Sequence, residues 1–285
     1  MKEIRQRIEA AASDSKLANS DETRRAVDEL LSLLERGEVR AAVREQNGKW
    51  SAVTWVKQGI LLGFRVGKLI DMSPTGSPES QEAAFSFFDK DTYPLRELSL
   101  GDSVRVVPGG SSIRRGSYIA PGVVCMPPMY INVGSYIGAD TMVDSHALVG
   151  SCAQIGERVH LSAAAQVGGV LEPINAAPVI VEDDVIVGGN CGIYEGTVVR
   201  AKAVIGAGVV LTRGTPVFDL VKETVYRGST DAPLEIPEGA VVVPGARNVK
   251  GEWGEAQGIS LQTPVIVKYR DEKTEHATAL ESWLR

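Results

Sequence analysis

The amino-acid sequence predicts a mainly β protein in which a parallel β-helix follows a small N-terminal α/β domain. Two observations carry this prediction. Apolar residues recur at every sixth position through much of the second half of the chain, and the 30 glycines, which crowd its middle, indicate many tight turns. The 285 residues are 44% hydrophobic and 23% charged, which is the composition of a globular protein with a full core.

Composition and charge exclude several classes of protein. No segment approaches the roughly 18 to 20 apolar residues of a membrane span, and no apolar signal core follows the charged first residues, so we expect a cytoplasmic protein. The net charge of -6 is spread along the chain without a basic block, which argues against a nucleic-acid partner. Cys125, Cys152 and Cys191 are scattered and form no CxxC pair, so we expect buried thiols and no bound metal.

Residues 1–102 are predicted to form the α/β domain. Ser20 is expected to cap a helix that Gly37 ends, because each residue type favours its position. The apolar residues between them follow helical spacing: Val27, Leu30, Leu31 and Leu34. Residues 39–46 and 49–55 are predicted to pair as a hairpin, joined by a two-residue type I′ turn at Asn47 and Gly48.

The rest of this domain is less strongly patterned. Residues 56–64 fit either a buried helix or a strand, and periodicity alone does not decide between them. Residues 73–82 contain two prolines and a glycine and are predicted to form a loop.

The sixfold repeat occupies the predicted β-helix domain, residues 103–248. Its first run of apolar positions is Ile119, Cys125, Ile131, Ile137, Val143, Val149, Ile155, Leu161 and Val167. After a two-residue phase shift the second run is Val181, Val187, Ile193, Val199, Ile205, Leu211 and Val217. A small or β-branched residue stands four positions after most of these. The pattern is interrupted at about residues 218–235, and two further units begin at Ile236 and Val242.

A period of six points to a coil of strands. Six is an even number, so a strand carries each repeated residue to the same side, whereas helical spacing does not. Each unit must then turn, and three units complete a triangular coil of eighteen residues, which would stack Ile119, Ile137 and Ile155 in one ladder. The apolar parts of the flat faces favour a cyclic oligomer. Residues 249–285 form a C-terminal extension with a predicted strand at 259–269 and a short helix at 278–284.

Several short sequence motifs narrow the range of possible functions. They are Arg105–Pro108, Thr141–Asp144, Val149–Gly156, Val159–Ser162, Gly168–Pro173 and Tyr194–Gly196. Over nearly its whole length the chain resembles the tetrahydrodipicolinate N-succinyltransferase family. The resemblance implies a left-handed β-helix, a homotrimer with sites between subunits, and transfer of a succinyl group from succinyl-CoA to the amine of a 2-amino-6-oxopimelate skeleton in lysine and diaminopimelate biosynthesis. Succinyl-CoA is expected as a co-substrate, without a permanently bound cofactor.

Candidate site residues follow from the chemistry together with the resemblance. An amine attacks a thioester only as the free base, so a proton acceptor is needed, and Asp144 and Glu195 interrupt apolar stretches within the matching strings. We predict both as catalytic, with Asp144 also binding substrate. Arginine suits planar carboxylates, so Arg105 and then Arg114 are the predicted ligands of the dicarboxylate, although each also fits an ordinary surface arginine.

Coenzyme A would be bound by residues of the later coils. Lys202, Arg247 and Lys250 are the candidate phosphate ligands, although ordinary surface charge is the favoured interpretation of all three. Backbone amides of Gly188 and Gly206 are predicted to contact the pantetheine arm, although glycine also serves the corners of a coil.

Other functions stay open. None of the three histidines forms the H-x-x-x-x-H pair of zinc-dependent hydratases on this fold, and His160 fits a structural role as well as a functional one. His146 stands where the family often has tryptophan, and Asn190 and Cys191 stand where it often has an Arg-Ser pair. A missing arginine keeps acetyl transfer to the same acceptor open. Acetylation of a sugar or serine and a non-catalytic scaffold are further alternatives.

Overall fold

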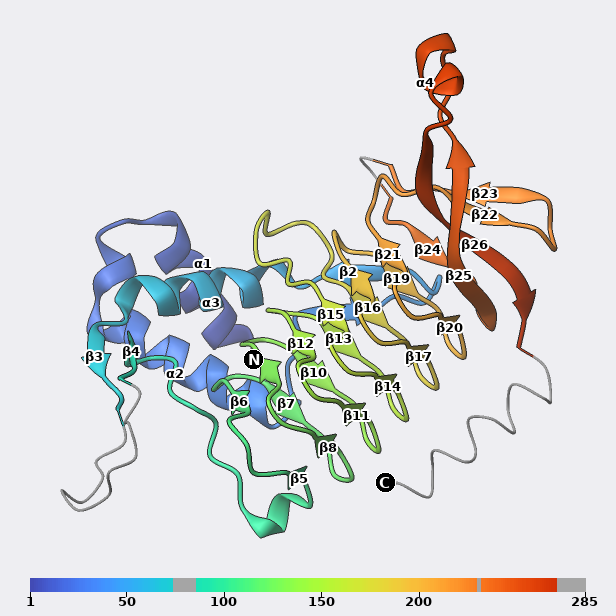
Figure 1. Ribbon diagram of the computed structural model, residues 1–285. Helices are drawn as coiled ribbons and strands as arrows, with labels where there is room; N and C mark the ends of the chain where they lie inside the picture. The colour runs from blue at the N-terminus through green and yellow to red at the C-terminus, as the bar shows by residue number, and fades with distance from the viewer. Residues whose placement is uncertain (74–85, 230–231, 271–285) are drawn as a thin grey trace.

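The computed structural model describes residues 1–73, 86–229 and 232–270, and it confirms the mainly β fold. Figure 1 shows a helical domain at one end, a long prism of short strands and a β-arm that projects from the other end. In the described part of the chain, no helix has the length and apolar character needed to cross a membrane.

Helices form the body of the N-terminal domain. They are α1 (Lys2–Ser13), the 3-10 helix η1 (Leu17–Asn19), α2 (Asp21–Glu35) and α3 (Thr54–Val66). The predicted capped helix is α2, in which the Ser20 hydroxyl accepts a hydrogen bond of 3.1 Å from the nitrogen of Thr23. Residues 56–64, which fitted two structures, are part of α3. This helix packs closely on α2, since a Cβ on Gly59 would lie 2.3 Å from a methyl of Leu30.

The predicted hairpin forms, but its turn differs from the prediction. Strands β1 (Ala42–Arg44) and β2 (Trp50–Ala52) are antiparallel, and the nitrogen of Glu45 donates to the carbonyl of Lys49, which leaves a three-residue loop. Of the two turn residues only Gly48 has a positive φ, +80°. Asn47 instead accepts a 2.8 Å hydrogen bond from the nitrogen of Lys49, an Asx turn that competes with the type I′ conformation.

Three short elements lead from this domain to the prism. Strands β3 (Leu69–Asp71) and β4 (Phe88–Lys90) form an antiparallel pair that the sequence did not predict, and the 3-10 helix η2 (Leu100–Asp102) follows. The predicted loop at 73–82, apart from Ser73, and the predicted helix at 278–284 lie outside the described residues.

The prism has three faces, numbered here in the order in which the chain visits them. Face 1 contains β5 (Arg105–Val106), β8 (Val124–Cys125), β11 (Met142–Val143), β14 (His160–Leu161), β17 (Ile186–Val187) and β20 (Val204–Ile205). Face 2 contains β6 (Ser112–Ile113), β9 (Tyr130–Ile131), β12 (Leu148–Val149), β15 (Gln166–Val167), β18 (Gly192–Ile193) and β21 (Val210–Leu211). Face 3 contains β7 (Tyr118–Ile119), β10 (Tyr136–Ile137), β13 (Gln154–Ile155), β16 (Ile180–Val181), β19 (Val198–Val199) and β24 (Glu235–Ile236).

The register of these strands confirms the predicted repeat. Along face 3 the inward residues pair in parallel as Ile119, Ile137, Ile155, Val181, Val199 and Ile236. All the predicted inward positions from 119 to 217 are buried, and they form one continuous core. The phase shift corresponds to an inserted loop, residues 168–178, between β15 and β16. The local period therefore sets which side chains fill the prism.

The prism carries two additions. The hairpin β1–β2 covers face 3, where Ala42 is buried against Ile180 and Val198. At the other end, β22 (Val217–Asp219) and β23 (Thr224–Tyr226) fill the interruption of the repeat. The arm consists of β25 (Ala240–Asn248), α4 (Glu252–Ala256) and β26 (Ser260–Tyr269), the predicted C-terminal strand, which pairs antiparallel with β25 and extends face 1.

Candidate active site

Asp144 follows strand β11 and lies on the prism edge between faces 1 and 2. Its backbone nitrogen donates to the carbonyl of Leu161 in the next coil, which fixes its position along the edge. The half-buried carboxylate accepts a 2.7 Å hydrogen bond from the nitrogen of Ser145 through Oδ1. Oδ2 has no hydrogen-bond partner among the described residues, so it is available to an incoming amine.

The same edge carries Gly188 and Gly206 in later coils. Successive ladder hydrogen bonds stack Asp144, Ser162, Gly188 and Gly206 above one another. A Cβ on Gly188 would lie 2.6 Å from the nitrogen of Ala207, and one on Gly206 would lie 2.9 Å from the carbonyl oxygen of Val242. Close approach of consecutive coils therefore requires both glycines, and their contact with the pantetheine arm stays a prediction.

Glu195 follows β18 and lies on the edge between faces 2 and 3. Its φ of +54° turns the exposed side chain outward, and Oε2 accepts a 3.1 Å hydrogen bond from the backbone nitrogen of Arg213 in the next coil. Two cavities of about 630 and 450 Å³ meet at this carboxylate, and Arg213 and Pro173 line both. Glu195 is thus the acidic group that both cavities share.

The inserted loop at 168–178 supplies a wall of both cavities, and Lys57 of α3 holds it. The Lys57 ammonium is fully buried and donates to the carbonyl oxygens of Pro173 and Ala176, at 3.1 and 2.8 Å. Burial lowers the pKa of Lys57 from its ordinary value. A helix of the N-terminal domain therefore determines the conformation of a loop at the prism edge.

Replacing Lys57 with methionine tests this connection. Lys57→Met keeps an unbranched side chain of similar length but leaves two carbonyl oxygens without a donor, so we expect the loop to lose about 1–3 kcal/mol of local stability. Hydrogen exchange of a peptide spanning residues 168–178 measures the loss, which corresponds to roughly fivefold to 150-fold faster exchange. Lys68→Met, at an exposed position beyond α3, is the control. Equal exchange in both variants would contradict the role assigned to Lys57.

The two predicted substrate arginines lie near the first coils. Arg105 is exposed on β5, on the same face as the strand that leads into Asp144. Arg114 is largely buried, forms an ion pair with Asp89 of β4, and has its guanidinium carbon 5.4 Å from the ring centres of Phe64 and Tyr93. These contacts join the N-terminal domain to the prism. Substrate binding by either arginine stays a prediction.

The predicted phosphate ligands are spread over two parts of the molecule. Lys202 lies on the edge between faces 3 and 1, where its backbone nitrogen donates to the backbone carbonyl of Asp183. Arg247 and Lys250 lie on and just beyond β25 of the arm. Among the described residues the buried Nε of Arg247 has no hydrogen-bond partner, and Lys250 is exposed.

Within one chain the structure does not bring the two carboxylates together. Asp144 and Glu195 occupy different edges of the prism, and Asp144 lines neither of the cavities that meet at Glu195. His160 lies on the outer side of face 1, between Met142 and Ile186. Among the described residues, no group of three or more histidine, cysteine or acidic side chains is arranged to hold a metal ion.

Sequence reasoning missed Lys57, Arg213 and Trp50 around the Glu195 cavities. Lys57 carried a recognisable signal, because it is a lysine between apolar residues of a buried segment. Arg213 and Trp50 had no recognisable sequence signal. The position of Arg213 depends on coil stacking, and that of Trp50 depends on the hairpin that folds over face 3.

Comparison with known proteins identifies the family. A family model described as "Tetrahydrodipicolinate N-succinyltransferase N-terminal" matches residues 3–66, and one described as "Hexapeptide repeat of succinyl-transferase" matches residues 178–213. The 2,3,4,5-tetrahydropyridine-2,6-dicarboxylate N-succinyltransferase of Nitrobacter hamburgensis is 41% identical over 94% of this chain and 92% of its own length. The proteins of that name from Nitrobacter winogradskyi and Rhodopseudomonas palustris are 40% and 39% identical over the same shares. The prism is accordingly the expected left-handed parallel β-helix of hexapeptide repeats, and the chain belongs to the tetrahydrodipicolinate N-succinyltransferase family.

Proposed function

We propose that this chain transfers a succinyl group from succinyl-CoA to the amine of tetrahydrodipicolinate, in its opened 2-amino-6-oxopimelate form, within cytoplasmic lysine and diaminopimelate biosynthesis. One observation carries the proposal: relatives named for this succinyl transfer are 39 to 41% identical over 94% of the chain. That similarity spans the N-terminal domain as well as the repeats. An acetyltransferase of sugars or serine, whose likeness is confined to the coil, is a weaker interpretation.

The proposed chemistry uses the two carboxylates in different ways. Glu195 borders both cavities and accepts the proton that the amine loses as it attacks the thioester carbonyl. The new amide bond forms as the carbon–sulfur bond breaks, and the proton taken by Glu195 passes to the departing sulfur, so that coenzyme A leaves as its thiol. Asp144, with one oxygen bound locally and the other available, orients the substrate amine. Arg105 and Arg114 are the proposed ligands of the acceptor carboxylates.

The site is proposed to form between subunits of a homotrimer. Asp144 and Glu195 lie on different edges of one prism, whereas an edge of a second subunit can supply the missing carboxylate. Faces 1 and 2 present partly exposed apolar side chains, among them Met142, Leu148 and Val210. Burying these against another subunit supports cyclic assembly. The proposed contacts of coenzyme A are the edge glycines Gly188 and Gly206 and the cations Lys202, Arg247 and Lys250.

A comparison of acyl donors tests the proposal. Purified protein is incubated with tetrahydrodipicolinate and either succinyl-CoA or acetyl-CoA, and release of the coenzyme A thiol is followed. We expect thiol release with succinyl-CoA that depends on the acceptor and exceeds the rate with acetyl-CoA by about tenfold or more, since the site must recognise the extra carboxylate.

Each other outcome has a defined meaning. Faster release with acetyl-CoA would mean that acetyl-CoA is the acyl donor, an outcome that the unusual Asn190 and Cys191 allow. Release with a hexosamine or serine in place of tetrahydrodipicolinate would mean that this compound is the acceptor. No release with any of these combinations would sink the proposed activity and favour a non-catalytic role.

A further inference from the structure

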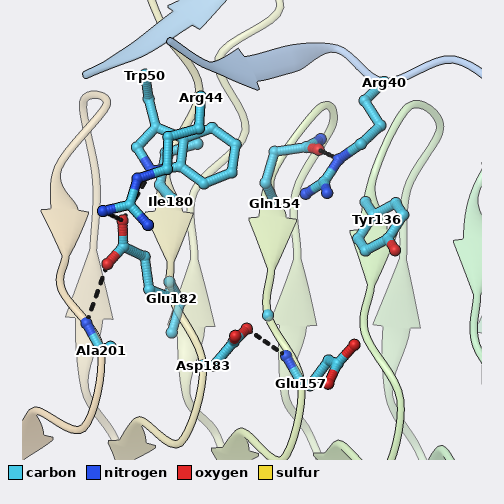
Figure 2. A pocket seen from close by; sticks show the side chains of 12 residues that line it. Arg40, Arg44, Trp50, Tyr136, Gln154, Glu157, Ile180, Glu182, Asp183 and Ala201 are labelled. Carbon is cyan, nitrogen blue, oxygen red and sulfur yellow. Dashed lines mark hydrogen bonds and ion pairs between the residues drawn. The ribbon is translucent and has the colours of Figure 1, made fainter. Parts of the chain in front are cut away.

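A separate cavity of about 280 Å³ lies between the hairpin β1–β2 and face 3, toward the edge with face 1. Figure 2 shows Arg40 and Trp50 entering it from the hairpin side, above the strands that carry Tyr136, Gln154 and Glu182. Among the described residues, it shares only Trp50 with the larger cavity at Glu195 and none with the smaller one. The proposed acyl transfer therefore leaves this cavity without a role.

Arg40 is held rigidly at one end of the cavity. Its guanidinium carbon lies 3.6 Å from the ring centre of Tyr136, and its Nε donates a 2.8 Å hydrogen bond to Oε1 of Gln154. Gln154 is itself buried, and its Nε2 donates to the carbonyl of Cys152 at 2.8 Å. In the part of the chain that the structure describes, the two terminal nitrogens of Arg40 make no hydrogen bond and no ion pair. A planar guanidinium is thus fixed in place, and its two terminal nitrogens are available to donate to a ligand.

Carboxylates lie across the cavity from this guanidinium, and they differ in what they bind. Glu182 is fully engaged, since it accepts hydrogen bonds from the Trp50 indole at 2.9 Å and from Arg200 at 2.9 Å. Glu157 forms a 2.8 Å ion pair with Arg158. Asp183 accepts only the backbone nitrogen of Glu157, at 2.9 Å, and is exposed; among the described cations none lies within ion-pair distance of it. Figure 2 places Asp183 and Glu157 at the opposite end from Arg40.

We propose that this cavity binds a small zwitterionic amino acid, with its carboxylate on the terminal nitrogens of Arg40 and its ammonium at Asp183. The two charges face one cavity without pairing with each other, so a ligand with both charges neutralises each of them. The Trp50 ring and the side chain of Ile180 line the same space and contact the aliphatic part of the ligand. An anion alone would leave Asp183 unpaired, and an amine alone would leave Arg40 unpaired.

Three probes with similar carbon chains test this assignment on the full-length protein without any acyl-CoA: L-norvaline, pentanoate and n-pentylamine. Ligand-observed NMR titration measures each dissociation constant. We expect L-norvaline to bind about tenfold or more tightly than either single-charge probe, since each of those lacks one charge-assisted contact. Arg40→Lys keeps the positive charge but loses the planar pair of terminal nitrogens, and it is expected to weaken L-norvaline binding by about tenfold.

Asp183→Asn is the second variant, chosen because this exposed side chain leaves the packing of the prism intact. It is expected to weaken L-norvaline binding by about tenfold and to leave pentanoate binding unchanged. Arg5→Lys and Asp28→Asn, on the surface of the helical domain, are the matched controls and are expected to bind as the unaltered protein does. Binding of pentanoate as tight as that of L-norvaline would overturn the zwitterion assignment. Absence of L-norvaline binding, or binding by Arg40→Lys and Asp183→Asn that is as tight as binding by the unaltered protein, would overturn the site. Because no acyl-CoA is present, these outcomes are independent of the proposed transfer.

Discussion

Glu195→Gln is expected to lower kcat for succinyl transfer by about 10² to 10⁴-fold, which is the contribution of a well-placed general base. Glutamine keeps the size of the side chain and an oxygen that can accept the hydrogen bond from the nitrogen of Arg213, so the turn should persist. The substitution removes the ability to take a proton, together with the negative charge of the carboxylate. The rate of thiol release at saturating succinyl-CoA and acceptor measures the effect.

The matched control is Glu223→Gln. Glu223 is also exposed and also has a positive φ, +51°, but it lies in the β22–β23 turn away from both Glu195 cavities. Its substitution should leave kcat unchanged. A Glu195→Gln protein with full activity would remove Glu195 from the mechanism and leave Asp144 as the remaining candidate base.

Mixing inactive variants tests whether the site is shared between subunits. Asp144→Asn and Glu195→Gln subunits are unfolded together in equal amounts and refolded as random trimers. If each site takes Asp144 from one subunit and Glu195 from its neighbour, about one site in four is intact, because each of the two residues is native with a probability of about one half. We expect about a quarter of the unaltered activity. A mixture no more active than its components would place both carboxylates in sites within single chains.

Leu161→Ala is expected to destabilise the protein by about 2–5 kcal/mol, the range for removing a fully buried leucine without refilling the space. Leu161 is 0% exposed and stacks between Val143 and Val187 in the inward ladder of face 1. Neighbouring coils fix the backbone on both sides, so the cavity cannot readily collapse. Urea unfolding at one fixed protein concentration measures the change, since assembly makes stability depend on concentration.

Val43→Ala provides the comparison for an exposed position. Val43 is 48% exposed on β1, in the hairpin over face 3 and outside the two faces proposed to pack against another subunit, and its truncation should cost less than about 1 kcal/mol. Equal losses for the two substitutions would mean that the six-residue ladder does not carry the stability of the prism.

The inward ladders could be predicted because each depends on a local rule. Alternation along a strand carries Ile137 inward whatever stands far from it in sequence, and the next coil repeats the rule at Ile155. The cap at Ser20 is equally local. The type I′ turn failed because Asn47 also supports a competing hydrogen bond, to the nitrogen of Lys49, that residue type alone does not rank. Arg114, predicted as a substrate ligand, forms its ion pair with Asp89, a contact that depends on how the helical domain docks.

The sequence by itself determined the coil, its breaks and the strings that mark the family, since period, turn chemistry and motif are properties of neighbouring residues. Only the tertiary structure decided that Lys57 holds the loop beside Glu195 and that Asp144 and Glu195 occupy separate edges. It alone brought Arg40 onto the ring of Tyr136, nearly a hundred positions later. Such pairings depend on how a domain and a hairpin pack against a stacked coil, and that packing energy is summed over many contacts that no short stretch of sequence contains.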